Sequence, residues 1–275
     1  MSSGHFDLAL SFPQWQGSGR STHLPRGGQA AAEVIARYAP LQRVPITAGS
    51  EPLEGINNWA AILEQFRAAQ SVLNATRPCR VLAAGGDCAV DVPIVDYLLR
   101  QYPELTLIWV DAHLDSNTTA TTPSGNFHGM PVAALLGSAP ARLAALLGKP
   151  LAPAQFRYAS AHVGDKGDWD FQKANELRWW DPQEVLSGPV HIHFDLDALD
   201  PRGFPYVAYP DGRMPMAEGV DLIRTIARGA DLVGLTITEF APATDSDAVA
   251  GSVYLRQLCE AAHASSTAPA RRCRT

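Results

Sequence analysis

Two short segments carry acidic and imidazole side chains at alternate positions, a spacing that suits metal binding. Side chains two residues apart in an extended chain point to the same side, and ligands bind beyond the carboxyl ends of strands in open α/β sheets. Each segment adjoins an apolar run, at residues 105–110 and 190–196, that is typical of a buried strand. The acidic and imidazole residues are Asp111, His113 and Asp115 in the first segment and Asp195 and Asp197 in the second.

Four carboxylates gathered at one place would repel each other unless positive charge lay between them. A pair of divalent cations would supply that charge and could activate a water molecule for hydrolysis. The alternative is that each cluster is a solvated loop at the end of a strand. The repetition of the spacing in two segments favours the metal site.

The elements that would position these residues alternate between strand and helix. Apolar runs predict strands at residues 5–12, 41–46, 80–84, 105–110, 156–163, 190–196 and 231–240. Helical spacing predicts helices up to residue 38 and at 56–75, 90–101, 130–147 (broken near Pro140), 216–228 and 249–264. Residues 164–169 are expected to form a polar loop. This alternation predicts an α/β fold with a parallel sheet covered on both faces.

Length and charge restrict the classes of protein that this chain could belong to. The 275 residues, 46% of them hydrophobic, are enough for one domain spanning 1–275, with 265–275 expected to form a disordered tail. The net charge of −6 and the absence of a basic run before the terminal ARRCR argue against nucleic acid and anionic membranes as partners. No signal peptide or membrane-length apolar run is found. The four cysteines form no CxxC pair, which predicts a reduced, cytoplasmic protein.

Five motifs in the same order resemble those of the arginase (ureohydrolase) family, which hydrolyses guanidino groups at a two-manganese site. They are GGDC at 85–88, WVDAHLDSN at 109–117, SGNFHG at 124–129, FDLDALDP at 194–201 and Glu239 after the last predicted strand. The resemblance covers most of the chain. It implies a three-layer arginase-like fold, with a mostly parallel sheet of about eight strands and helices on both faces. It also implies two Mn²⁺ ions per chain.

The resemblance assigns metal-binding roles to the acidic residues. Asp111 and Asp195 would bridge the two metals, Cys88 and Asp115 would complete one site, and His113 and Asp197 the other. Glu239 would pair with the cationic guanidino group, and His128 would transfer a proton to the leaving amine. Asp115 is counted among the catalytic residues as well. His191 and His193 are expected to be hydrogen-bond partners of the ligands, or strand residues with satisfied hydrogen bonds, rather than ligands themselves.

Other matched positions predict a small amino-acid substrate. Asn117 and Ser124 stand where arginases hold the substrate's α-carboxylate. Asp165 is the candidate for the α-amino group, with Asp168 in reserve because the segment GDKGDWD departs from the family pattern. Residues 202–214 depart from it too. Trimeric arginases use a C-terminal extension that this chain lacks, so a monomer is expected at least as much as a trimer.

Cys88 is the main departure, because the family has a metal-binding histidine at this position. It could be a small packing residue or a thiolate ligand, which would make the metal a weaker Lewis acid and suits manganese poorly. A cysteine here resembles the branch of the family that supplies hydroxyurea for D-cycloserine biosynthesis. That resemblance implies hydrolysis of Nω-hydroxy-L-arginine to hydroxyurea and L-ornithine. An ordinary arginase that releases urea and a metal-poor, non-catalytic binding relative are the alternatives.

Overall fold

The computed structural model describes residues 6–19 and 23–264, and in these residues eight parallel strands form one sheet in the order β2-β1-β3-β8-β7-β4-β5-β6. The predicted parallel sheet is therefore confirmed. The strands are β1 Leu8–Ser11, β2 Leu41–Arg43, β3 Val81–Ala84, β4 Thr106–Val110, β5 Phe156–Ala159, β6 Arg178–Trp179, β7 Pro189–Asp195 and β8 Asp231–Thr238. The predicted disordered tail, 265–275, lies outside the described residues.

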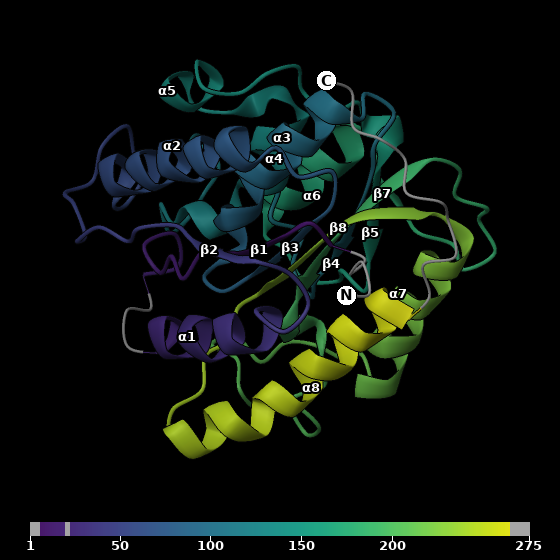
Figure 1. Ribbon diagram of the computed structural model, residues 1–275. Helices are drawn as coiled ribbons and strands as arrows, with labels where there is room; N and C mark the ends of the chain where they lie inside the picture. The colour runs from purple at the N-terminus through teal and green to yellow at the C-terminus, as the bar shows by residue number, and fades with distance from the viewer. Residues whose placement is uncertain (1–5, 20–22, 265–275) are drawn as a thin grey trace.

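Helices cover both faces of the sheet, as the alternating pattern predicted (Figure 1). The helices are α1 Leu24–Ile35, α2 Trp59–Thr76, α3 Asp91–Gln101, α4 Pro131–Ala133, α5 Ala141–Ala144, α6 Lys166–Ala174, α7 Met216–Gly229 and α8 Asp245–Ala264. On one face α2 packs with α3, and on the other α8 packs with α1 and α7. Each face has its own apolar core, so the sheet is buried on both sides.

The register of the central strands brings the two acidic segments to one edge of the sheet. β7 lies between β4 and β8, with Trp109 opposite His193 and Asp195 opposite Thr238. Because all the strands run in parallel, their carboxyl ends meet at the same edge. Asp111, directly after β4, and Asp195, the last residue of β7, therefore lie side by side.

The structure differs from the sequence-based elements in two places near the site. β5 ends at Ala159, not at residue 163, because Ser160 adopts a left-handed backbone conformation (φ 72°) that ends the strand. The predicted polar loop at 164–169 was wrong, since α6 begins at Lys166. Its N-cap, Asp165, accepts hydrogen bonds from the backbone N–H groups of Gly167 and Asp168.

The segment predicted as a helix at 130–147 is broken into short pieces. α4 runs into a π-helical turn, Ala134–Ser138, in which Gly137 has a non-helical backbone (φ 101°). α5 then begins after Pro140. Cys88 and Cys259 carry free thiols, whereas Cys79 is bonded in a disulfide, a departure from the expected reduced set. Within residues 6–19 and 23–264, no helix combines the length and the hydropathy needed to cross a bilayer.

Candidate metal centre

The carboxylates of Asp111 and Asp195 are held in place by the backbone of their own loops. Asp111 accepts hydrogen bonds from the N–H of His113 (2.7 Å) and from Nε1 of Trp109 (3.1 Å). Asp195 accepts one from the N–H of Asp197 (2.6 Å). Each aspartate therefore caps the turn that carries the next candidate ligand, which fixes the spacing of the acidic pair on both segments.

Cys88 reaches this edge from a different strand, through the GGDC turn that follows β3. Gly86 has a φ of 73°, and a Cβ atom there would lie 2.5 Å from the carbonyl oxygen of Gln14, so only glycine fits. Asp87 then accepts a hydrogen bond from the N–H of Ala89 and caps the turn Cys88–Val90. This places the buried Cys88 thiol 2.7 Å from Oδ2 of Asp195, to which it donates.

Two groups of donor atoms, each with its members within 4.8 Å of one another, meet at Asp111. One group is Cys88, Asp111, His193 and Asp195, and the other is Asp111, His113 and Asp197. The expected sharing of Asp111 between two sites is thus possible in this geometry. Asp115 belongs to neither group, and Asp195 belongs only to the first. His193, which was not expected to be a ligand, has a ring nitrogen that belongs to the first group.

The electrostatics of this cluster require a counter-charge. Burial raises the pKa of Asp195 well above its usual value, and Asp197 and Asp111 raise it further. Burial and Asp111 raise the pKa of Asp197 to about 7. Burial and Asp195 likewise raise the pKa of the Cys88 thiol. The carboxylates cannot all be ionised at neutral pH without a cation, so the donor set and its charge fit a pair of divalent metal ions.

His113 joins the cluster from the loop after β4. Its Nδ1 lies 3.3 Å from Oδ1 of Asp111 and 3.1 Å from Oδ2 of Asp197, and its Nε2 lies 3.3 Å from Oδ2 of Asp211. Burial alone would lower the pKa of His113, but Asp197 and Asp111 outweigh it and raise the pKa far above its usual value. Asp197 and Asp111 therefore stabilise positive charge at this imidazole.

Two other acidic residues at this edge have strained backbones. Asp115 and Glu239 both have positive φ, 48° and 57°, which non-glycine residues rarely adopt. Both side chains are buried, and Oδ2 of Asp115 accepts no hydrogen bond from any residue that the structure describes. Such strain, about 1–3 kcal/mol per residue, is concentrated at functional sites. Their strained backbones therefore mark Asp115 and Glu239 as candidate functional residues.

A cavity of about 230 Å³ opens beside the cluster. Its walls include Cys88, His113, Asp115, His128, Asp165, Asp168, Asp195, Asp197 and Tyr209. Of the predicted catalytic residues, Asp115 and His128 line the cavity, and the buried Glu239 lies behind the wall with its Oε1 3.6 Å from Nδ1 of His128. Burial lowers the pKa of His128, which keeps the imidazole neutral near pH 7.

The predicted substrate-binding residues lie in two different environments. Asp165 and Asp168 line the cavity, and the buried Asn117 donates to both, at 3.0 and 2.9 Å. Asn117 therefore holds the two carboxylates in place. Ser124 is exposed on a neighbouring loop outside the cavity wall, where its hydroxyl accepts a hydrogen bond from the N–H of Asn126. The structure thus brings Asp165 and Asn117 together, but not Ser124.

Comparison with known proteins decides the family. The pattern of the arginase family matches residues 32–263. The chain belongs to the arginase family. It is 32% identical to the arginase of Eremothecium gossypii over 182 residues, which are 58% of this chain and 45% of that protein. The chain spans about half the length of the curated relatives that it matches.

Solved structures share the arginase-like fold. The arginase of Entamoeba histolytica, in complex with L-ornithine, has a TM-score of 0.81 and 16% identity, covering 95% of this chain and 99% of that one. The formiminoglutamase of Trypanosoma cruzi, with two Mn²⁺ ions, has a TM-score of 0.65 and 17% identity, covering 92% and 93%. The eight-stranded parallel sheet flanked by helices is thus the fold of this family.

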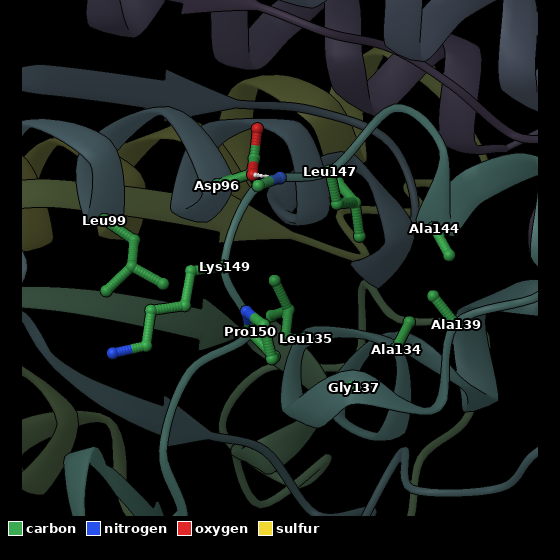
Figure 2. Close-up of a pocket in the computed structure, with 11 residues that line it drawn as sticks. Asp96, Leu99, Ala134, Leu135, Gly137, Ala139, Ala144, Leu147, Lys149 and Pro150 are labelled. Atoms are coloured by element: carbon green, nitrogen blue, oxygen red, sulfur yellow. Dashed lines mark hydrogen bonds between the residues drawn. The ribbon is translucent and has the colours of Figure 1, made fainter.

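A second cavity, of about 130 Å³, shares no lining residue with the cavity beside the acidic cluster and is mostly apolar (Figure 2). Its one buried charge, Asp96, is already engaged, because it accepts a hydrogen bond from the N–H of Gly148 and pairs with Arg100 at 2.9 Å. Figure 2 shows the Lys149 side chain extending to the side of Leu99, away from Ala139 and Ala144. This cavity offers no group that could take part in guanidine chemistry.

Sequence reasoning missed three residues near the centre. Tyr209 lines the cavity and Asp211 contacts His113, both from the segment whose sequence departs from the arginase pattern. No spacing signal could have found them, since they reach the site from a long loop. Asp91, beneath the cluster, accepts hydrogen bonds from His191 and His193. The alternation of His191, His193 and Asp195 on one strand was the available signal for it.

Proposed function

We propose that this chain is a two-metal amidinohydrolase that converts Nω-hydroxy-L-arginine and water to hydroxyurea and L-ornithine, a reaction that supplies hydroxyurea for D-cycloserine biosynthesis. The observation that carries the proposal is the position of Cys88. Its thiol is buried, 2.7 Å from Asp195, and belongs to the first donor group. A packing role alone does not account for a sulfur atom that close to a carboxylate.

The substrate preference follows from the electronics of the sulfur ligand. A thiolate donates more charge than an imidazole, so the cation that it binds is a weaker Lewis acid. The unmodified guanidine of arginine is strongly basic and so remains a guanidinium cation, whose central carbon resists nucleophilic attack. N-hydroxylation makes the guanidine less basic, and the neutral form is the better electrophile. A weakened centre is therefore better matched to the hydroxylated substrate.

Two Mn²⁺ ions are the proposed cofactors. Cys88, Asp111 and Asp195 would hold one, and Asp111, His113 and Asp197 the other, with Asp115 beside the first. When bound, the cations would neutralise the carboxylates, lower the pKa of a water molecule and polarise the guanidino group. The chain's own contribution is to fix the donors on rigid strand ends and to keep the cluster buried.

Glu239 and His128 are proposed to serve the leaving group. The buried Glu239 carboxylate would accept hydrogen bonds from the guanidino nitrogens and stabilise their positive charge. His128 is neutral near pH 7, so its free ring nitrogen can accept a proton and pass it to the departing amine. The 3.6 Å separation of the two side chains allows one nitrogen to be reached by both.

The amino-acid end of the substrate is proposed to lie against the first turn of α6. Asp165, on the cavity wall, would pair with the α-amino group, and Asn117 would hold Asp165 and Asp168 in position. Ser124 remains the proposed contact of the α-carboxylate, although it lies on a neighbouring loop outside the cavity wall. These contacts would select α-amino acids over decarboxylated guanidines.

Metal analysis combined with turnover tests the proposal. The purified protein would be stripped with chelator, reloaded with Mn²⁺, and assayed for ornithine and hydroxyurea from Nω-hydroxy-L-arginine. We expect two ions per chain and turnover that depends on them. An ordinary arginase would instead release urea from L-arginine with comparable efficiency. A chain that binds no metal and turns over neither substrate would be a binding relative, and the proposal would be wrong.

A further inference from the structure

His193 lies directly beneath the metal cluster and is not used by the proposed reaction. It comes two residues before Asp195 on β7, so both side chains point to the same side of the strand. Its ring is fully buried and stacks on the indole of Trp109 from the neighbouring β4, with centroids 3.5 Å apart and planes within 5°. The imidazole is therefore held in a single orientation.

The hydrogen bonds of His193 fix which ring nitrogen carries the proton. Nδ1 lies 3.1 Å from Oδ2 of Asp91, and Nε2 of His191 lies 2.9 Å from the same oxygen. The hydroxyl of Thr236 donates to the other oxygen, Oδ1. Both carboxylate oxygens of Asp91 are surrounded by these donors. With Nδ1 of His193 donating to Asp91, Nε2 is the nitrogen left to act as an acceptor or a metal ligand.

Nε2 of His193 approaches the donor group through the hydroxyl of Thr238. Nε2 lies 3.3 Å from this hydroxyl, which is itself 3.9 Å from the Cys88 sulfur. A ring nitrogen of His193 lies within 4.8 Å of the donor atoms of Cys88, Asp111 and Asp195. Metal-binding histidines generally donate their other N–H to a carboxylate, which fixes the tautomer. Asp91 and His193 have this arrangement.

We propose that His193 is a nitrogen ligand of the cation that Cys88, Asp111 and Asp195 hold. This inference rests on the proposed two-metal centre and specifies one of its two sites. The site then has sulfur, nitrogen and oxygen donors, whereas the site of His113 has oxygen and nitrogen donors only. Thiolate and imidazole favour Zn²⁺ or Co²⁺ over Mn²⁺. The cysteine site should therefore bind Zn²⁺ or Co²⁺ more tightly than the site of His113 does, although both sites accept the Mn²⁺ of the proposed reaction.

Cobalt titration of the metal-free protein tests this directly, because Co²⁺ bound to a thiolate gives an intense charge-transfer absorption. We expect two Co²⁺ per chain, one of which produces this band, and Cys88→Ser should abolish it. His193→Asn keeps a donor for Asp91 but removes Nε2, and should weaken the thiolate site by about 10–100-fold or more. His191→Gln is the matched control, since it alters the other histidine on Asp91 and should leave the band and the affinity unchanged.

The outcomes distinguish the proposed two-metal centre from the proposed ligand role of His193. Wild-type protein that binds no Co²⁺ would overturn the two-metal centre and with it the role of His193. Wild-type binding with an unchanged titration of His193→Asn would overturn only the ligand role. Circular dichroism of each metal-free variant checks that it folds. Proton NMR of the wild-type cobalt protein needs no variant: two hyperfine-shifted imidazole N–H signals support His193 as a ligand beside His113, and one signal contradicts it.

Discussion

At the scale of single residues, the centre is distinguished by a sulfur atom among carboxylates. Cys88 and Asp195 are both buried, and the sulfur lies 2.7 Å from Oδ2 of Asp195. Without a cation the thiol therefore stays protonated and donates a hydrogen bond to the carboxylate. A bound cation would displace that proton, since metal ligation favours the thiolate. The residue at position 88 therefore sets both the charge and the softness of the first site.

Replacing Cys88 by histidine should shift the proposed activity toward L-arginine. An imidazole removes one negative charge, so the cation becomes a stronger Lewis acid. We expect the ratio of kcat/KM for Nω-hydroxy-L-arginine to that for L-arginine to fall by about tenfold or more, which corresponds to about 1.4 kcal/mol. The measurement is steady-state ornithine release. Cys259→Ala, at a buried thiol in α8, is the control and should leave the ratio unchanged. An unaltered ratio in Cys88→His would show that the sulfur ligand does not set the substrate preference.

Glu239 should be needed for turnover but not for metal binding. Glu239→Gln keeps the shape of the side chain and removes the charge that is proposed to stabilise the guanidino cation. We expect kcat/KM to fall by about 10²-fold or more, with the metal content unchanged. Glu218→Gln, on the exposed side of α7, is the control. Normal activity in Glu239→Gln would show that this carboxylate does not contact the substrate.

At the scale of elements, the segments with strong hydrophobic periodicity were predicted correctly, and a helix without it was missed. The central strands and the long helices were predicted because buried apolar runs and helical spacing are direct consequences of packing. α6 was missed because its sequence, KGDWDFQKA, is polar and contains a glycine. Its signal was the pair Asp165 and Asp168, a capping arrangement in which each carboxylate accepts from the other's backbone N–H.

The sequence predicted that the acidic residues lie close together, but not the full geometry of the candidate site. The acidic pairs after β4 and β7 follow from strand spacing and parallel topology, so sequence placed them at one edge. The grouping of His193 with Cys88 depends on the register between β4, β7 and β8, which no local pattern encodes. Tyr209 reaches the cavity from a loop, and Asn117 turns toward α6. Tertiary packing decides such contacts.

Removing the Asn117 side chain should loosen the first turn of α6. Its Nδ2 donates to Asp165 and Asp168, and its Oδ1 accepts from the hydroxyl of Thr121. Asn117→Ala leaves the buried Asp168 carboxylate without one donor, so we expect a loss of about 1–3 kcal/mol in the free energy of unfolding. Urea denaturation would measure it. Asp170→Asn, at an exposed ion pair in the same helix, should change stability by less than about 0.5 kcal/mol.

At the scale of the whole molecule, the parallel sheet concentrates negative charge at one buried edge. Residues from β3, β4, β7 and β8 all contribute to it, and no local rearrangement could separate them without breaking the sheet. The fold therefore pays an electrostatic penalty that a bound cation relieves. Metal binding and stability should be coupled, since any ligand of the folded state alone stabilises it.

This coupling gives the metal-free protein a definite pH dependence. The pKa of Asp197 and that of Asp87 are raised to about 7 from a usual value of 3.8. A carboxyl whose pKa is higher in the folded state contributes stability at low pH and loses it as the pH rises through the folded pKa. We expect the metal-free protein to lose roughly 1–3 kcal/mol between pH 5.5 and pH 8, and Mn²⁺ to restore it. Equal thermal stability at both values without metal would contradict this.

The most direct test of the proposed substrate preference is a comparison of two substrates. Manganese-loaded protein would be given Nω-hydroxy-L-arginine and L-arginine side by side, and kcat/KM would be measured for each from ornithine release. Preference for the hydroxylated substrate by at least about 100-fold, or about 2.7 kcal/mol, is the result that the Cys88 site predicts. Equal or better turnover of L-arginine would contradict it, and the chain would then be an ordinary arginase that tolerates a cysteine.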